Sequence, residues 1–297
     1  MRIFLTGATG FIGSRIVPEL IAAGNQVLGM TRSDAGAASL AAQGAAAHHA
    51  TLEDLASIRA GAEQADAVIH TAFDHDFSNF VANCEKDGRV ITALGEVLQG
   101  SDRPILITSG TGMGTPGPGQ PADEDVFNLD HPNPRSISEV TGAKLLDAGI
   151  DVRIVRLPQV HDTHRQGLIS PMVDIARAKG FAAWIGDGAN RWPAGPVDAV
   201  ARLYQLALDK GERGARYHAV AEEGIAARTI VETVAAGLGL PARSITPEEA
   251  PAYFGWLGML AGLDMPASSA KTRARLGWDP TGPSLIEDLR NMDYSAI

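Results

Sequence analysis

The sequence has a single cysteine, Cys84, among its 297 residues. One thiol cannot form a disulfide within the chain, and a structural zinc site built from four thiolates is excluded as well. This composition is typical of proteins from the reducing cytoplasm, which is the location we expect.

Long apolar segments and an excess of positive charge are also missing. No window of 18 apolar residues occurs, so we expect no membrane-spanning helix and no membrane partner. The net charge of −10 opposes nonspecific binding to phosphates, so nucleic acid is not an expected partner either. The N-terminal segment has three glycines and no Ala-x-Ala cleavage site, and we do not interpret it as a signal peptide.

The first half of the chain alternates strand-like and helix-like segments. Ile12, Ile16 and Leu20 recur at helical spacing, and the strand-like segments are RIFLTG, QVLGMT, ADAVIHTA, RPILITSG and DVRIVRLP. Repeated strand–helix units with short connections predict a parallel sheet that is covered by helices on both faces. We therefore predict an α/β fold of the doubly wound Rossmann type.

The pattern changes after Pro158 and becomes mostly helical. The helices expected there span 168–179, 197–210, 226–238 and 284–291. We expect a dinucleotide-binding domain over residues 1–160 and a smaller, mostly helical substrate domain over residues 161–297. Within the second, the part at roughly 197–222 is expected to return to the first sheet.

Three glycines indicate a phosphate-binding turn at the start of the chain. Gly7, Gly10 and Gly13 stand in TGATGFIG, after a strand and before a helix. One glycine permits a tight turn, one lets backbone N–H groups approach a diphosphate, and one lets the helix pack on the strand. The helix N-terminus adds partial positive charge. The expected cofactor contacts in this turn are Gly7, Thr9, Gly10, Phe11, Ile12 and Gly13.

The end of the second strand, MTRSDAG, indicates which dinucleotide is bound. NAD-binding proteins usually have an acidic residue here to hold the ribose hydroxyls, whereas this chain has Arg32 and Ser33. A guanidinium can bind a 2′-phosphate through two hydrogen bonds, and Asp34 is expected to cap the next helix. We predict NADP, with NAD as the alternative. In the other interpretation Arg32 is a solvated loop charge.

Four motifs at strand ends resemble those of the extended short-chain dehydrogenase/reductase superfamily, which includes nucleotide-sugar epimerases, dehydratases and 3β-hydroxysteroid dehydrogenases. These motifs are TGATGFIG, VIHTA, ITSGT and VRLPQV, and the resemblance is good over residues 1–160. FDHDF, RSISE and GDGANRW are similar to an atypical branch of the superfamily. The resemblance implies a Rossmann fold, a nicotinamide dinucleotide and chemistry at a carbonyl or alcohol.

The resemblance also implies roles for individual positions. By position, Ser109 corresponds to the catalytic Ser/Thr of the superfamily. Thr51 stands where an adenine-contacting aspartate is usual. The further cofactor contacts implied are Leu52 near the adenine, Thr71, Ala72 and Phe73 after the fourth strand, and Pro158, Gln159 and Val160 beside the nicotinamide.

The Tyr–Lys pair that follows this serine in the superfamily is missing. None of the four tyrosines has a lysine four positions later, and NPRSISE offers Arg135 and Glu139 at the corresponding place. An arginine, with a pKa above about 12, does not readily donate a proton at neutral pH, but it can stabilise an oxyanion or bind a carboxylate. Ser136 and Glu139 have the spacing of a helix capping box, which is the simpler interpretation of the glutamate.

The candidate catalytic residues are therefore Ser109, Arg135 and His75. Ser109 would bind the carbonyl oxygen and Arg135 would polarise it or anchor the substrate. His75 lies between two aspartates that could raise its pKa, so it or water would supply the proton. The alternatives are a turn residue for Ser109 and an exposed helix-capping residue for His75. No metal is expected, because the two histidines of HDTH lack a third ligand.

Taken together, the sequence predicts an NADP(H)-dependent oxidoreductase acting on a small, partly apolar carbonyl or alcohol. FAAWIGDG and YFGWLGML supply the apolar character on the substrate side. A non-catalytic NADP-binding or sensing protein is the first alternative, because both members of the pair are lost. An epimerase or isomerase that recycles its cofactor is the second. The expected partner is a small-molecule substrate. The sequence leaves open whether the chain forms a homodimer.

Overall fold

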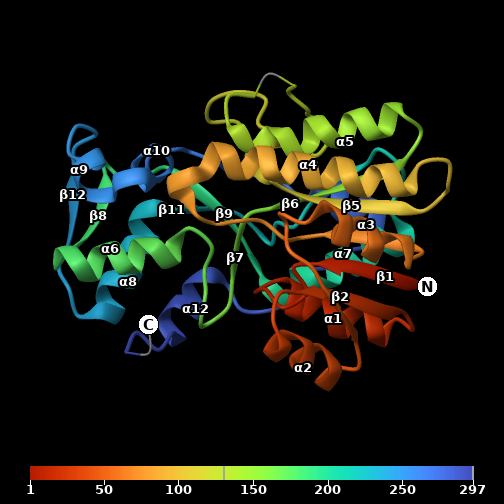
Figure 1. Cartoon of the computed structure of the whole chain (residues 1–297). Coiled ribbons are helices and arrows are strands. Elements are labelled where there is room, and N and C mark those ends of the chain that lie inside the picture. The colour runs from red at the N-terminus through yellow and green to blue at the C-terminus, as the bar shows by residue number, and fades with distance from the viewer. Residues whose placement is uncertain (130, 296–297) are drawn as a thin grey trace.

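A computed structural model describes residues 1–129 and 131–295. Its largest element is a seven-stranded parallel sheet with the strand order β10-β6-β5-β4-β1-β2-β3 (Figure 1). The strands are β1 (Arg2–Thr6), β2 (Gln26–Thr31), β3 (Ala46–His49), β4 (Ala67–His70), β5 (Pro104–Gly110), β6 (Asp151–Leu157) and β10 (Arg216–His218). The order confirms the predicted doubly wound Rossmann-type fold.

Helices cover both faces of this sheet, as Figure 1 shows. Those on one face are α1 (Gly13–Ala22), α2 (Asp34–Ala42) and α7 (Val197–Lys210), and those on the other are α3 (Leu55–Glu63), α4 (Phe80–Leu98) and α5 (Ile137–Asp147). Along β1, Ile3 and Leu5 are buried on the side of α1, and Phe4 is buried on the side of α3. Burial on both faces explains why the strand is apolar at three successive positions, Ile3 to Leu5.

The rest of the chain builds two small sheets, ordered β11-β9-β7 and β12-β8, around a second apolar core that contains Trp192. Their strands are β7 (Gln159–His161), β8 (Ala182–Ile185), β9 (Arg191–Pro196), β11 (Glu222–Ala226) and β12 (Ala242–Ile245). The helices are α6 (Ile169–Lys179), α8 (Ala227–Leu238), α9 (Ala250–Phe254), α10 (Gly258–Ala261), α11 (Ala270–Leu276) and α12 (Leu285–Asn291). The 3₁₀ turns of the chain are η1 (Phe77–Asn79), η2 (Thr111–Gly114), η3 (Pro134–Ser136) and η4 (Gly255–Leu257).

The predicted helices of the second half agree with the structure to within one residue at each end. The five short strands there were not predicted. Strand β9 contains Pro193 and Gly195, which are unfavourable in most strands, and β11 carries two glutamates. Among the described residues, no helix is both long enough and apolar enough to cross a membrane.

Candidate functional site

The carboxyl ends of β1 and β4 lie side by side at the point where the strand order reverses. Ligands of open α/β sheets bind at this position. Thr6 is the register partner of His70, so the glycine turn and the segment Thr71–Phe73 leave the sheet together. Two sets of residues expected to contact the cofactor, far apart in sequence, are thereby brought to one place.

The three glycines of the turn differ in what surrounds them. Gly7 has a φ of +69°, and a Cβ there would lie 2.8 Å from the backbone nitrogen of Ala72. At Gly13 a Cβ would lie 2.1 Å from the carbonyl oxygen of Gly7. At exposed Gly10 it would meet only that same oxygen, at 3.1 Å. Packing therefore requires the first and third glycines, whereas the second leaves open backbone that fits a dinucleotide diphosphate.

Arg32 and Ser33 follow β2, next to this turn. The Ser33 hydroxyl caps α2 by accepting a hydrogen bond from the amide of Gly36 at 3.2 Å. The prediction that Asp34 is the cap is wrong, because Asp34 is already the first residue of the helix. Arg32 is exposed and makes no ion pair or side-chain hydrogen bond with any described residue. Its guanidinium is free to bind an anion.

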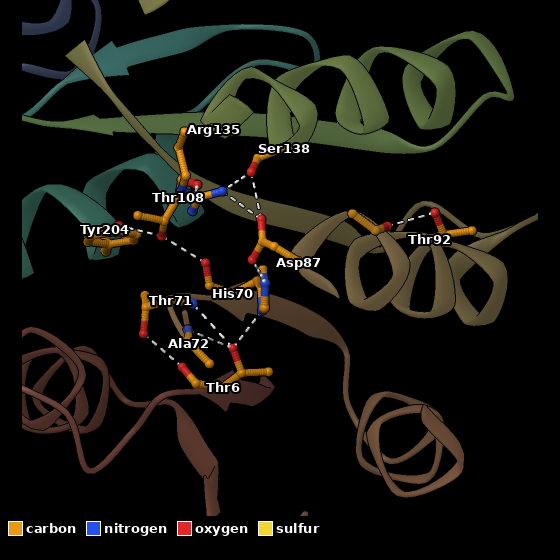
Figure 2. A network of polar contacts seen from close by, with 11 residues as sticks. Thr6, His70, Thr71, Ala72, Asp87, Thr92, Thr108, Arg135, Ser138 and Tyr204 are labelled. Carbon is orange, nitrogen blue, oxygen red and sulfur yellow. Dashed lines mark hydrogen bonds and ion pairs between the residues drawn. The ribbon is translucent and has the colours of Figure 1, made fainter. Parts of the chain in front are cut away.

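A buried chain of polar contacts, the Asp87 network, runs through the switch point (Figure 2). The Thr6 hydroxyl accepts hydrogen bonds from the amides of Thr71 and Ala72, both at 3.2 Å, so its own proton faces His70 Nδ1 at 2.7 Å. That leaves the proton of His70 on Nε2, which lies 2.9 Å from Asp87 Oδ1. These contacts fit the tautomer of His70 that carries its proton on Nε2.

Arg135 completes this network from the segment just before α5. Its Nη1 donates to Asp87 Oδ2 at 2.6 Å and to the hydroxyl of Ser138, and its Nη2 donates to the carbonyl of Thr108 at 3.0 Å. The guanidinium carbon lies 4.3 Å from the centre of the Phe73 ring. The hydrogen on Nε and one on Nη2 have no acceptor among the described residues, and the side chain is 15% exposed.

The charge of Asp87 is strongly compensated. Burial alone would raise the pKa of this carboxyl, but Arg135 and the hydrogen bonds from His70 and Ser138 hold it below its usual range. Arg135 is therefore half of a nearly buried ion pair. Its bond to the carbonyl of Thr108 places it near the carboxyl end of β5.

Glu139 does not form the predicted capping box. Ser136 makes no capping hydrogen bond, and Glu139 instead accepts from Nε and Nη2 of Arg156 on β6, both at 2.8 Å, and from Arg216 at 3.1 Å. Glu139 and Arg156 are both completely buried. Burial would raise the pKa of Glu139, but Arg156 lowers it, so the carboxylate is ionised. A charge-assisted, two-point bond outweighs a helix cap.

The structure places Ser109 in the protein interior and His75 at the surface. Ser109 is 4% exposed, and its hydroxyl makes no hydrogen bond of regular geometry, so it is not open to a substrate. His75 lies on the surface after β4, with ring contacts to Phe73 and Phe77. Neighbouring atoms partly desolvate the ring and so lower the pKa of His75, and the charge of Arg135 lowers it further. The expectation of a raised pKa is therefore wrong, because these effects exceed that of Asp74.

The other expected cofactor contacts differ in accessibility. Thr71, Ala72, Phe73, Leu52, Phe11, Ile12 and Pro158 are half-buried, and Thr9 is exposed. Gln159 and Val160 are buried in β7, where Gln159 Oε1 accepts from the amide of Leu168 at 2.8 Å. Their side chains therefore face protein, and of the three residues expected beside the nicotinamide only Pro158 has part of its surface open.

Three of the four tyrosines of the chain are buried. Tyr204 is buried, its hydroxyl lies 2.7 Å from that of Thr108, and burial raises its pKa. Tyr217 and Tyr253 are buried on β10 and α9, and Tyr294 lies near the C-terminus. Within the described residues, no three His, Cys, Asp or Glu side chains are grouped to hold a metal.

Sequence analysis missed Asp87, Thr108, Ser138 and Arg156. A signal for the first exists, because Asp87 lies three residues after Cys84 and four before Ile91, on the apolar stripe of the long helix. A carboxylate on a buried stripe needs a partner. Which partner it finds depends on how α4 and α5 pack, which a single sequence does not specify.

Solved structures of other proteins have the same overall fold. A dTDP-glucose 4,6-dehydratase from Streptomyces venezuelae, with NAD and DAU bound, superposes with a TM-score of 0.78 at 21% identity, over 100% of this chain and 97% of that one. A UDP-glucose 4-epimerase from Thermus thermophilus in complex with NAD has a TM-score of 0.75 at 21% identity, over 98% and 97% of the two chains. At this identity the likeness shows a shared fold.

Sequence comparison finds relatives along almost the whole chain. An uncharacterised protein of Schizosaccharomyces pombe is 43% identical over 295 residues, covering 99% of this chain and 100% of that protein. An uncharacterised protein of Saccharomyces cerevisiae is 38% identical over 293 residues, covering 98% of both. The model of the NAD dependent epimerase/dehydratase family matches residues 3–221. The chain belongs to the NAD dependent epimerase/dehydratase family.

Proposed function

We propose that the protein is an NADP(H)-dependent oxidoreductase that acts on a small, partly apolar carbonyl or alcohol. The observation that carries the proposal is the open glycine turn at the switch point, beside an unpaired Arg32. When bound, the nicotinamide dinucleotide supplies hydride transfer. The protein's own residues hold the cofactor, orient the substrate and stabilise developing charge.

Arg32 is the basis for NADP rather than NAD. It is exposed directly after β2, where the ribose of the adenosine half lies in Rossmann folds. No described residue competes for its guanidinium, so a 2′-phosphate can bind it at two points. A carboxylate that would repel this phosphate is absent at the end of β2, because Asp34 is the first residue of α2.

Arg135 is the group we assign to the substrate oxygen. Its position is fixed by Asp87, Ser138 and Thr108, and it keeps two N–H groups that are not bonded within the described protein. A guanidinium fixed in this way stabilises negative charge on oxygen without giving up a proton. With the pKa of His75 lowered, little imidazolium exists at neutral pH, so water supplies the proton.

An apolar wall at the same edge supports a partly apolar substrate. Phe77, in the turn before α4, stacks on Trp256 with ring centres 4.2 Å apart and planes 6° from parallel. Trp256 comes from the second half of the chain and remains 38% exposed. Phe73 and His75 continue this aromatic surface towards Arg135. A flat or aliphatic group would pack on these rings while its oxygen meets the guanidinium.

One observation favours a second candidate, a protein that binds NADP without redox turnover. Arg135 and Glu139 stand where the resemblance implies the Tyr–Lys pair, and each is in a buried or nearly buried ion pair. Proteins that sense a cofactor need the binding surface but no proton donor. An epimerase with a recycled cofactor is less well supported, because it needs an acid and base at the same edge.

Titration calorimetry with NADPH and NADH tests the cofactor assignment. We expect NADPH to bind at least about tenfold more tightly, as one charged two-point contact provides, and Arg32→Ala to remove that difference. Arg228→Ala is the control, because Arg228 is an exposed arginine paired with Glu232 on α8. Absence of binding by either cofactor contradicts the proposal.

Turnover on a panel of carbonyl compounds separates the candidate functions. Accumulation of oxidised cofactor supports the oxidoreductase, tight binding without turnover supports the sensor, and a changed product without net oxidation supports the epimerase. In the first case Arg135→Gln should lower kcat at least about tenfold and leave the Kd of NADPH nearly unchanged. An unchanged kcat would remove Arg135 from the mechanism.

A further inference from the structure

The loop after β7 carries a cation whose function the proposal above leaves open. Its backbone is closed by Asp162, whose Oδ1 accepts from the amides of His164 and Arg165 at 2.7 and 2.8 Å. The amide of Asp162 in turn donates to the carbonyl of Arg165 at 2.9 Å. This double closure fixes the backbone at Arg165.

The same loop is tied to protein on both sides. Gln166 is completely buried, and its Nε2 donates to the carbonyl of Asp162 at 2.9 Å. The carboxylate of Asp162 lies 3.6 Å from Arg15, which is in the first turn of α1. The loop is therefore held beside the helix whose start forms the glycine turn.

Arg165 extends from this loop towards the glycine turn. Its guanidinium carbon lies 5.9 Å from the centre of the Phe11 ring, and Phe11 is the residue after Gly10. The positive charge of Arg165 is also close enough to lower the pKa of His75, on the segment after β4. Arg165 is thus near both segments that leave the switch point.

The charge of Arg165 is not compensated within the described protein. The side chain is exposed and makes no ion pair or side-chain hydrogen bond with a described residue. Arg135, on the neighbouring segment before α5, is neutralised by Asp87. A dinucleotide diphosphate carries two negative charges, and a helix N-terminus offsets only about half of one. An uncompensated cation beside the turn would therefore strengthen binding of the diphosphate.

We propose that Arg165 binds the diphosphate of the dinucleotide, opposite the amides of the glycine turn. This inference rests on the proposed function, because it assumes that a dinucleotide lies in the turn. It gives the second half of the chain a direct part in holding the cofactor. The glycine turn contributes neutral amides and Arg165 contributes the full positive charge.

Calorimetry with two probes isolates the diphosphate contact. NADPH contains the diphosphate, whereas adenosine 2′-monophosphate has the 2′-phosphate and no phosphate at the 5′ position. We expect Arg165→Gln to weaken NADPH at least about tenfold at low salt and to change the affinity for the monophosphate by less than about threefold. Arg165→Lys should give an intermediate loss, and His164→Gln, at the exposed neighbouring position, should have no effect.

Each outcome decides a separate question. If the wild-type protein binds neither probe, the proposed function fails. If the wild-type protein binds NADPH and Arg165→Gln binds it equally well, this inference is overturned while the proposed function stands. If Arg165→Gln raises only the KM of a substrate, the guanidinium belongs to the substrate and the inference is overturned as well. Unchanged thermal melting of Arg165→Lys excludes misfolding as the cause of a loss.

Discussion

Arg135 Nη1 lies 2.6 Å from Asp87 Oδ2, and this ion pair joins the segment before α5 to the middle of α4. Asp87 is 2% exposed, so the pair is almost completely removed from water. The pair holds a fixed cation, which is also bound by the hydroxyl of Ser138 and the carbonyl of Thr108.

Removal of Asp87 should destabilise the protein strongly. Asp87→Ala leaves Arg135 and the Nε2–H of His70 without their acceptors, and loss of one partner of a buried pair costs about 3–5 kcal/mol. Urea unfolding measures this change. The control is Arg59→Ala, which breaks an exposed pair with Glu96 and should cost less than about 1 kcal/mol.

A double-mutant cycle identifies the cause of this loss. Asp87→Ala combined with Arg135→Met removes both charges, so the double variant should lose less free energy of unfolding than the two single changes added together. Strict additivity would show that the two residues act independently, contrary to the contact in the structure.

A lysine at position 139, where the resemblance to the superfamily implies one, should disrupt the fold rather than support activity. Glu139→Lys places a second cation against completely buried Arg156 and close to Arg216. We expect a loss of more than about 4 kcal/mol, because a favourable buried pair becomes a repulsive one. Glu139→Gln, which keeps an oxygen acceptor, should lose clearly less. A stable, folded Glu139→Lys would contradict the assigned pairing, and circular dichroism with urea unfolding distinguishes these outcomes.

The glycine turn allows stability and binding to be separated. Gly13→Ala drives a methyl group into the backbone of Gly7 and should lower the free energy of unfolding by about 1–3 kcal/mol or more. Gly10→Ala meets only the Gly7 carbonyl at 3.1 Å and should stay within about 1 kcal/mol of wild type. It should nevertheless weaken NADPH at least about tenfold by covering the open backbone. Equal cofactor affinity in Gly10→Ala and wild type would place the ligand elsewhere.

Sequence patterns predict the sheet of the first half because its strands are buried on both faces. Strand β1 is apolar from Ile3 to Leu5, and such runs separated by helical periods have few alternative interpretations. The strands β8 and β12 have four residues each, and only one side chain of β12 is buried. Strands that are this short and half-exposed show no alternation of apolar and polar residues that could be detected in the sequence.

The limits of prediction at the site have a similar origin. The glycine turn is local, so its spacing is informative. Ser136 and Glu139 also fit a local pattern, but Glu139 bonds Arg156, seventeen residues away on the neighbouring β6. Local sequence cannot show that a buried guanidinium will face the start of the helix. The same holds for Asp87 and Arg135, which come together only when α4 and α5 pack.

His218 gives the protein a defined pH dependence. Burial and the nearby Arg156 lower the pKa of His218 to about 4, against about 6.5 in an unfolded chain. The Nδ1 lies 2.8 Å from the carbonyl of Ser268 and the Nε2 lies 3.2 Å from Arg156 Nη1, which suits a neutral ring. Between these two pH values the unfolded state binds more protons, so stability falls as the pH falls through this range.

The size of this effect is testable between pH 7 and pH 5, where most carboxylates remain ionised. A group with these two pKa values loses about 2 kcal/mol of stability over that interval. His218→Asn keeps a donor near the carbonyl of Ser268 but does not titrate. The variant should be less stable than wild type at pH 7 and should show a curve of unfolding free energy against pH that is flatter by about the same amount. Parallel curves for the two proteins would mean that His218 is protonated in the folded state at pH 5.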